Sequence, residues 1–253
     1  MSAIYTWGAT NEKGESDPLC RVTLYALKGV WETEMERALV IGDTGGIGAA
    51  LAATLRQRGV KVRGMSRRDG FDVTEPASVE AQLGALKDVF DLVFVASGAL
   101  TSTRSGPEKA LRDVSAEEMA AQFAVNAIGP ALVLRHAKRL LPRKGRSIFA
   151  VLSARVGSIG DNRAGGWYSY RASKAALNQI VRTASIEIAR THRKAMCVAL
   201  HPGTVLTPFT AGYPCHAKNT PEEAAGNLLD VVNGLKASDT GGFFDYSGAR
   251  VEW

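Results

Sequence analysis

The sequence has few of the features that mark secreted, metal-binding or membrane proteins. It contains three cysteines and four histidines among 253 residues, without the spacing of a disulfide framework or a zinc site. No apolar run is long enough to cross a bilayer, and the first residues lack the apolar segment of a signal peptide. We therefore expect a cytoplasmic protein with no metal and no transmembrane segment.

Aromatic residues are missing from the most basic part of the chain. Lys and Arg exceed Asp and Glu by 31 to 25, and the densest basic cluster runs from Arg135 to Arg146. Proteins that bind single-stranded nucleic acid place aromatic rings among their basic residues, which this cluster does not do. The cluster lies where a helix is expected to end, and cations there complement the helix dipole. We expect no nucleic-acid partner.

Linkers and repeats are also missing, and apolar runs alternate with helical patterns from residue 35 to residue 253. This alternation predicts an α/β fold with a single doubly wound parallel sheet and helices on both faces, which is a Rossmann-like arrangement. Residues 1–34 show no clean period and are predicted to be a dispensable extension. The predicted strands are 38–41, 60–65, 71–73, 92–96, 147–152, 195–200 and 242–245, and the predicted helices include 49–58, 115–141, 170–190 and one that begins after Thr220.

A glycine-rich segment joins the first predicted strand to the first helix. Gly42, Gly46 and Gly48 follow a Gly-x-x-x-Gly-x-Gly spacing at this junction. Glycines allow a tight turn and the close approach of a pyrophosphate, which the N–H groups and dipole of a helix N-terminus then favour. A glycine-rich turn without a ligand is the alternative interpretation.

Two arginines follow the second predicted strand, where an acidic residue would bind the adenosine ribose of NAD(H). The residues here are Arg67 and Arg68 after Ser66. An arginine at this place can pair with a ribose 2′-phosphate, so the sequence favours NADP(H), with NAD(H) as the second possibility. Asp43 in the glycine segment opposes this preference, because its carboxylate would repel the phosphate. The alternative is a solvated arginine loop.

A tyrosine and a lysine lie four residues apart at the start of a long helical pattern. Tyr170 and Lys174 would therefore share one face of the helix. A nearby ammonium favours the ionised form of a phenol, which suits proton transfer near neutral pH. The same spacing is common on ordinary helix surfaces, so the pair alone leaves both interpretations open.

The order of these motifs resembles the short-chain dehydrogenase/reductase family over about residues 37–253. The residues that carry the resemblance are the glycine segment, Asn126, Ser153, Tyr170 and Lys174. Segments 153–159 and 165–178 resemble the C-factor branch of this family in particular. The resemblance implies an oxidoreductase that interconverts a small-molecule carbonyl and an alcohol.

The resemblance also implies a role for each of four residues. Tyr170 would be the general acid and base, and Ser153 would hydrogen-bond the same substrate oxygen. Lys174 would hold the nicotinamide ribose and stabilise the tyrosinate, and Asn126 would keep a water in a proton relay. The implied cofactor-binding residues are Gly42, Thr44, Gly46, Ile47, Gly48, Arg67, Asp72, Val73, Ala96, Gly98, Tyr170, Lys174, Pro202, Gly203, Val205 and Thr207.

The chain departs from the family pattern in three places. Residues 95–98 are Val-Ala-Ser-Gly, where the family often has Asn-Asn-Ala-Gly, and the segment between the second and third predicted strands is too short for the usual helix. The loop that contains residues 161–166 is long, and together with residues 208–215 it is expected to shape the substrate pocket.

The resemblance leads to two further expectations, one on assembly and one on an alternative function. The family commonly assembles through its two long central helices, here 115–141 and 170–190, so a homodimer or homotetramer is expected. The resemblance to C-factor keeps an alternative function open, which is a cofactor-binding signalling protein with little turnover.

Overall fold

Six parallel strands form one sheet in the order β2-β1-β3-β4-β5-β6. The computed structural model describes residues 35–210, 212 and 218–253, and the predicted extension at residues 1–34 lies outside them. The central strands β3 and β4 are buried along their whole length, and β1 and β5 along all but one residue, as expected for a sheet covered on both faces. The strands are β1 Arg37–Ile41, β2 Lys61–Met65, β3 Leu92–Val95, β4 Ser147–Leu152, β5 Ala195–His201 and β6 Phe243–Asp245.

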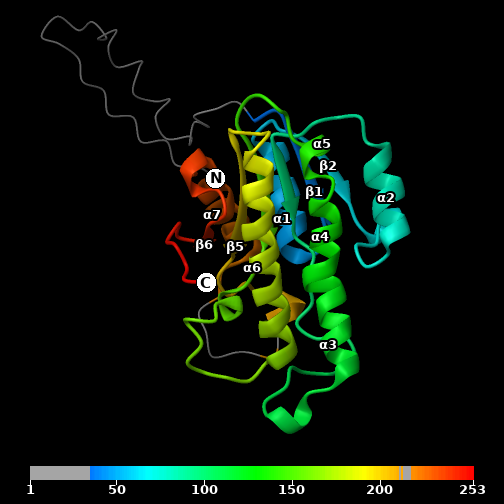
Figure 1. The fold of residues 1–253 in the computed structure, drawn as a ribbon, viewed down its shortest axis with the longest axis vertical. Helices are drawn as coiled ribbons and strands as arrows, with labels where there is room; N and C mark the ends of the chain where they lie inside the picture. Colours follow the sequence, from blue (N-terminus) through cyan, green and yellow to red (C-terminus); the bar gives the residue numbers. More distant parts are fainter. Residues whose placement is uncertain (1–34, 211, 213–217) are drawn as a thin grey trace, which may run out of the picture. The chain divides into compact units, whose positions relative to one another are not determined.

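Helices cover both faces of this sheet, which confirms the predicted doubly wound α/β fold. Helices α1 and α7 contact each other on one face, while α6 packs with α3 and α4 on the other face (Figure 1). The helices are α1 Gly46–Gln57, α2 Pro76–Ala85, α3 Ala116–Phe123, α4 Gly129–Leu134, α5 Ala137–Leu140, α6 Tyr168–Ala189 and α7 Pro221–Gly234.

The strand order reverses between β1 and β3, and this reversal locates the crevice of the sheet. From β1 the chain moves outward to β2, and it then returns to place β3 on the other side of β1. Ligands of open α/β sheets bind beyond the carboxyl ends of the strands at such a switch point. The glycine segment after β1 and the Ala96–Gly98 segment after β3 both begin there.

The predicted strand at residues 71–73 is wrong, and the sheet has six strands rather than seven. Asp72 Oδ1 accepts hydrogen bonds from the Thr74 N–H at 2.8 Å and from the Thr74 hydroxyl at 2.7 Å, which closes a turn. An aspartate that bonds the backbone in this way competes with strand pairing. Phe71 is buried in the core, and Val73 packs against Gly129 of α4 instead of joining the sheet.

The predicted continuous helix at residues 115–141 is interrupted twice. Ser115 caps its start by accepting the Glu118 N–H at 3.2 Å. A π-helical turn at Ala124–Ile128 follows α3, and the helix breaks again between α4 and α5. Such π-turns within α-helices are frequent at functional sites, and this one contains Asn126.

Two arginines of the basic cluster at residues 135–146 donate hydrogen bonds at the C-terminal ends of other helices. Arg139 donates to carbonyls of Leu83 and Leu86 at the end of α2, and Arg146 donates to the Val232 carbonyl at 2.6 Å at the end of α7. Cations at helix C-termini interact favourably with the helix dipole. Two arginines of this cluster therefore have structural partners within the fold.

Candidate functional site

The glycine segment forms a tight turn that leads directly into α1. Gly42 has a φ of +85°, and a β-carbon there would lie 3.1 Å from the Ser97 nitrogen. A β-carbon at Gly48 would collide with the Gly42 carbonyl. Because α1 begins at Gly46 without a side-chain cap, its first N–H groups remain available as donors for an anion. This arrangement fits a pyrophosphate.

Segments after two other strands border the glycine segment. A β-carbon at Gly46 would lie 2.7 Å from the Thr207 methyl group, so the segment after β5 reaches over the start of α1. A β-carbon at Gly48 would lie 3.2 Å from the Ala96 β-carbon, so the segment after β3 also borders the glycine segment. Within the segment after β5, Pro202 and Val205 are buried. The predicted cofactor-binding segments therefore meet at the carboxyl edge of the sheet.

Tyr170 and Lys174 share one face of α6, as their spacing predicts, and the structure buries this face. The Lys174 Nζ atom donates to the Leu152 carbonyl at 2.8 Å and lies 5.9 Å from the centre of the Tyr170 ring. Burial lowers the pKa of Lys174 to about 7. Burial also raises the pKa of Tyr170, which is opposite to the direction predicted from the lysine charge. Desolvation outweighs the attraction between the two groups here.

Ser153 follows β4 and is held by a residue from α6. Its hydroxyl donates to Asn178 Oδ1 at 2.6 Å, and Asn178 Nδ2 donates to the Gly157 carbonyl at 3.2 Å. Ser153 and Asn178 are both buried. Tyr170, Lys174 and Asn178 follow one another at intervals of four residues, so a single helical face carries all three. Sequence reasoning missed Asn178, although extending the same spacing by one turn finds it.

Asn126 fixes the loop after β3 instead of facing solvent. Its Nδ2 donates to the Ala99 carbonyl at 2.8 Å, and its Oδ1 accepts the Ala99 N–H at 2.9 Å. A β-carbon at Gly98 would lie 3.3 Å from Asn126 Oδ1 and 3.4 Å from Lys174 Nζ. Asn126 and Lys174 therefore border the same small space beside Gly98.

A row of buried polar side chains continues from Asn126 along α3. Asn126 donates to Gln122 at 2.6 Å, Gln122 donates to Glu118 at 2.9 Å, and Glu118 accepts the Ser102 and Thr103 N–H groups. Burial is the largest single influence on the pKa of Glu118 and raises it. The hydrogen bonds from Thr103, Ser102 and Gln122 together outweigh burial, so the pKa lies below its ordinary value. Sequence reasoning missed Gln122 and Glu118, which precede Asn126 at intervals of four residues.

The residues predicted for the adenosine part of a dinucleotide lie near the end of β2. Arg67 begins a short 3₁₀ turn, Arg67–Asp69, and is exposed, as is Thr44 in the glycine segment. The Thr74 N–H, more than any other group, lowers the pKa of Asp72, with a smaller contribution from the charge of Arg67. Arg67 is free to reach an anionic ligand beside β2, because its side chain is exposed.

Asp43 lies between the glycine segment and β2. A β-carbon at Gly64 would collide with the Asp43 carboxylate, so the side chain lies directly on β2. Its Oδ1 atom is buried without a hydrogen-bond partner. A buried polar atom without a partner is costly and marks a place where a ligand donor or water would be accepted. The carboxylate that would repel a 2′-phosphate therefore does lie at this end of the site.

A metal-binding cluster and a membrane-spanning helix are both absent from residues 35–210, 212 and 218–253. No cluster of three or more His, Cys, Asp or Glu residues in this part could hold a metal ion. None of its helices is both long and apolar enough to span a membrane. Part of the predicted pocket segment 208–215, namely residues 211 and 213–215, lies outside the described residues.

Comparison with known proteins identifies relatives along most of the chain. A family model described as Enoyl-(Acyl carrier protein) reductase matches residues 69–231. A 1-hydroxy-2-glutathionyl-2-methyl-3-butene dehydrogenase of Rhodococcus sp. (strain AD45) is 30% identical over 236 residues, which cover 87% of this chain and all of that protein. The C-signal protein of Myxococcus xanthus is 40% identical over 153 residues, which cover 59% of this chain and 87% of that protein.

A solved structure shares the fold as well. A putative short-chain dehydrogenase/reductase from Burkholderia multivorans with bound NADP superposes with a TM-score of 0.71 and 27% identity, covering 87% of this chain and all of that one. The chain therefore belongs to the short-chain dehydrogenase/reductase family, and it is an oxidoreductase, as the order of its motifs predicts.

Proposed function

We propose that this oxidoreductase is an NADP(H)-preferring enzyme of the cytoplasm that interconverts a small carbonyl compound and its alcohol. The observation that supports this function best is the gathering of Tyr170, Lys174 and Ser153 at the carboxyl ends of β4 and the start of α6. All three are at most 6% exposed, and such burial is unusual for a lysine.

Each of these residues has a role that follows from its chemistry. Tyr170 donates its phenolic proton to the carbonyl oxygen during reduction and takes it back during oxidation. The Ser153 hydroxyl donates its single proton to Asn178 Oδ1, and it would rotate to donate this proton to the same substrate oxygen when the substrate binds. Lys174 is anchored to the Leu152 carbonyl, and its remaining protons are available to a ribose and, as ammonium, to the tyrosinate. Asn126 orders the backbone beside Lys174, where it would also hold a relay water.

The cofactor is proposed from the fit of the glycine segment and Arg67. The uncapped start of α1 and the close packing of Gly42 and Gly48 suit a pyrophosphate. Arg67 is exposed beside β2 and suits a 2′-phosphate, and the Burkholderia relative contains NADP. When bound, the nicotinamide supplies or accepts the hydride. NAD(H) remains the alternative because Asp43 lies at the same end of the site.

The proposal is tested by following NADPH oxidation with a panel of small aldehydes and ketones. Tyr170→Phe removes only the phenolic oxygen, so it should lower turnover by about 10²- to 10⁴-fold while leaving NADPH affinity nearly unchanged. Turnover that survives this substitution would overturn the proposed role of Tyr170. Tyr168→Phe is the matched control, because it makes the same chemical change two residues earlier on α6.

The similarity to the C-signal protein favours a second candidate, a signalling protein that binds the cofactor with little turnover. This candidate predicts NADPH binding in a titration of nucleotide fluorescence but no oxidation with any carbonyl of the panel. Turnover that depends on Tyr170 would exclude it as the main function.

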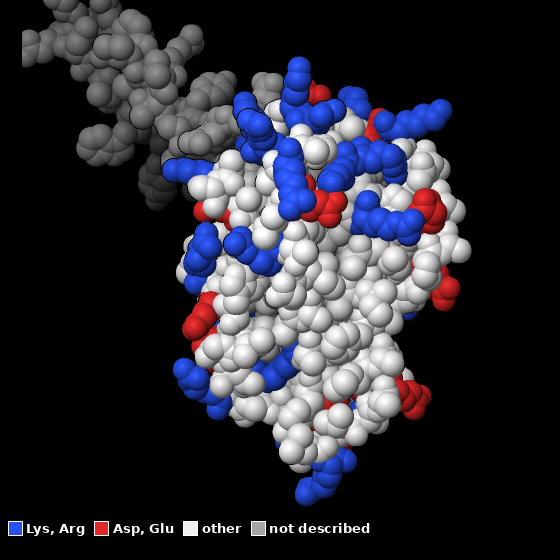
Figure 2. Space-filling view, in the orientation of Figure 1, with Lys and Arg blue, Asp and Glu red and all other residues white. Residues whose placement is uncertain are grey.

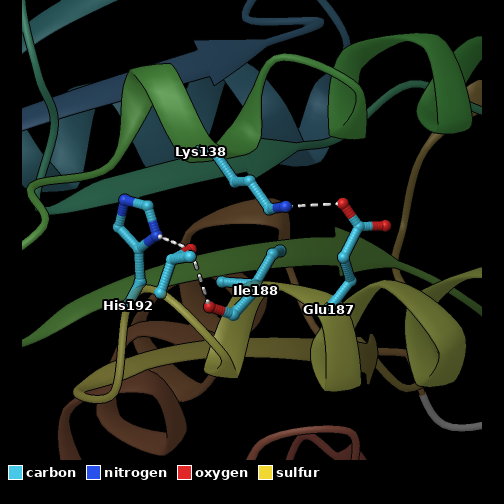
Figure 3. A network of polar contacts seen from close by, with 5 residues as sticks. Lys138, Glu187, Ile188 and His192 are labelled. Atoms are coloured by element: carbon cyan, nitrogen blue, oxygen red, sulfur yellow. Dashed lines mark hydrogen bonds and ion pairs between the residues drawn. The ribbon is translucent and has the colours of Figure 1, made fainter.

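We also propose that the protein forms a homodimer or homotetramer through α4, α5 and α6. A hollow of about 410 Å³ lies between these helices and includes Ala131, Ile180 and Ala184. Figure 2 shows Lys and Arg gathered above this area, while few charged side chains lie over α4 and α6. The Lys138–Glu187 ion pair, at 2.6 Å, joins α5 to α6 in the same hollow (Figure 3).

Sedimentation velocity tests this assembly. Thr183 is exposed in the hollow, so Thr183→Arg should place a charge in the interface and yield monomers. A wild-type protein that sediments as a monomer would contradict the proposal.

A further inference from the structure

The N-cap residue of α6 provides no side-chain hydrogen bond to the start of the helix. Trp167 occupies the N-cap position with a φ of +54°, and it is the single non-glycine residue at positive φ among those that the structure describes. Its indole contains no hydrogen-bond acceptor, so it cannot satisfy the first N–H groups of the helix as Ser, Thr or Asp would. Tyr170 follows within the first turn of this helix. The helix that carries the proposed proton donor therefore needs an acceptor from elsewhere.

Glu108 provides this acceptor from a distant part of the chain. Its backbone carbonyl accepts the Trp167 N–H at 2.5 Å, and its Oε2 accepts the Ser169 N–H at 3.4 Å. The Ser169 hydroxyl donates to Oε1 of the same carboxylate. Glu108 thus binds the residue before α6 and the second residue of α6 together. A carboxylate at a helix N-terminus also complements the helix dipole.

Burial makes the loss of the Glu108–Ser169 hydrogen bonds costly. Glu108 and Ser169 are each 1% exposed, so neither finds water as a substitute partner if the other is removed. Ser169 directly precedes Tyr170, whose ring contacts those of Trp167 and Phe209 edge-on at 6.2 and 5.9 Å. Movement at residues 167–169 would therefore be transmitted directly to the phenol.

We propose that Glu108 is a positioning residue that caps α6 and holds Tyr170 where proton transfer requires it. This inference rests on the proposed function, in which Tyr170 is the proton donor. Glu108 lies in the loop between β3 and α3, which Asn126 and Glu118 bind at its other end. The same loop is therefore fixed beside Lys174 at one end and beside Tyr170 at the other.

The test combines turnover with local hydrogen exchange. Glu108→Ala removes both side-chain bonds to Ser169 and should lower kcat by about 10- to 100-fold, because a small misplacement of a reacting group has effects of this size. NADPH affinity should stay unchanged, since Glu108 does not reach the glycine segment or Arg67. Amide exchange in a peptide that covers residues 167–172 should accelerate, while exchange in β4 and β5 should not.

Two milder variants keep the test decisive if Glu108→Ala folds poorly. Glu108→Gln retains one acceptor oxygen, and Ser169→Ala retains the backbone N–H. The loss of kcat should therefore be largest for Glu108→Ala, smaller for Glu108→Gln and smallest for Ser169→Ala. Glu223→Ala is the control, because Glu223 caps α7 by accepting the Thr220 N–H at 2.7 Å and lies on another helix. It should lower the melting temperature without changing kcat.

The outcomes separate this inference from the proposed function. If Tyr170→Phe is inactive while the Glu108 variants keep full kcat at temperatures well below their melting points, Glu108 is only structural and the inference is wrong. If Tyr170→Phe remains active, the proposed function fails first. Faster exchange at residues 167–172 in Glu108→Ala would in that case still establish the cap.

Discussion

The two ends of the candidate site are built in opposite ways. At the nicotinamide end, which we define as Asn126, Ser153, Tyr170 and Lys174, every side chain is at most 6% exposed. At the adenosine end, defined as Thr44 and Arg67, both side chains are exposed. The nicotinamide end lies between β4, α6 and the π-turn, whereas the adenosine end lies on loops after β1 and β2.

This difference indicates how each end acts. Most buried polar groups are held by hydrogen bonds, so the position of such a group is determined by its neighbours and its loss affects both chemistry and stability. An exposed arginine contributes little to folding, because water replaces its partners. Substitutions at the nicotinamide end should therefore change turnover or stability, and substitutions of the exposed Thr44 and Arg67 should change cofactor affinity alone.

The largest effect is expected at Lys174. Lys174→Met keeps the length of the side chain but removes the amine, so kcat should fall by about 10²- to 10⁴-fold, as for loss of a proton-transfer group. Steady-state kinetics with saturating NADPH measure this effect. Activity within a fewfold of wild type would show that the buried amine has no part in the chemistry. It would also contradict the expected difference between the two ends of the site.

Arg67 should affect only the cofactor. Arg67→Ala removes a charge-assisted pair with the 2′-phosphate, which is worth about 1.5–3 kcal/mol and corresponds to about 10- to 150-fold weaker NADPH binding. NADH affinity and the melting temperature should be almost unaffected. Isothermal titration with both nucleotides measures the ratio. Asp43→Ser should shift the same ratio toward NADPH, and equal losses for both nucleotides in Arg67→Ala would contradict the assignment.

Asn126 should contribute to stability as well as to the site. Asn126→Ala leaves the Ala99 N–H and carbonyl without their buried partner, so the free energy of unfolding should fall by about 1–3 kcal/mol. Urea unfolding followed by circular dichroism measures this change. Thr44→Ala is the exposed control from the adenosine end and should stay within about 0.5 kcal/mol of wild type. Equal effects in both variants would remove the difference between the ends.

The buried amine also predicts a pH dependence of stability. The pKa of Lys174 is about 7 in the folded protein against 10.5 ordinarily, so between these values the unfolded chain holds a proton that the folded chain lacks. The free energy of unfolding should therefore rise with pH above about 7, by at most about 1.4 kcal/mol per pH unit from this group. Urea unfolding at pH 7, 8 and 9 should show a steeper rise in wild type than in Lys174→Met. Identical slopes would refute the prediction.

Much of the fold could be predicted because it depends on local patterns. The apolar run at residues 147–152 predicts a strand with the bounds of β4, and the Thr220 cap with Glu223 predicts the start of α7. Gly59 directly follows the predicted helix at residues 49–58 and has a φ of +85°, as a glycine after a helix C-terminus commonly does. These features require only neighbouring residues.

The predictions that failed depend on competition between local and distant partners. Phe71 and Val73 have the apolar character of a strand, but the Asp72 side chain closes a turn with Thr74 instead. The π-turn around Asn126 cannot be seen in a pattern that reads as one continuous helix. The sequence also predicts the wrong direction for the pKa of Tyr170, because the burial that raises this pKa is a property of the packed molecule.

Apart from the strand at residues 71–73 and the unbroken helix at 115–141, local patterns predict the alternation of strands and helices. They also predict the edge of the sheet at which the motifs meet, since parallel strands bring their carboxyl ends together. Which groups touch at this edge depends on the packing of the whole chain. Ser153 with Asn178, and Glu108 with Ser169, are separated by 25 and 61 residues along the chain. Hydrogen bonds and burial of this kind arise from packing between distant segments, and no local pattern specifies them.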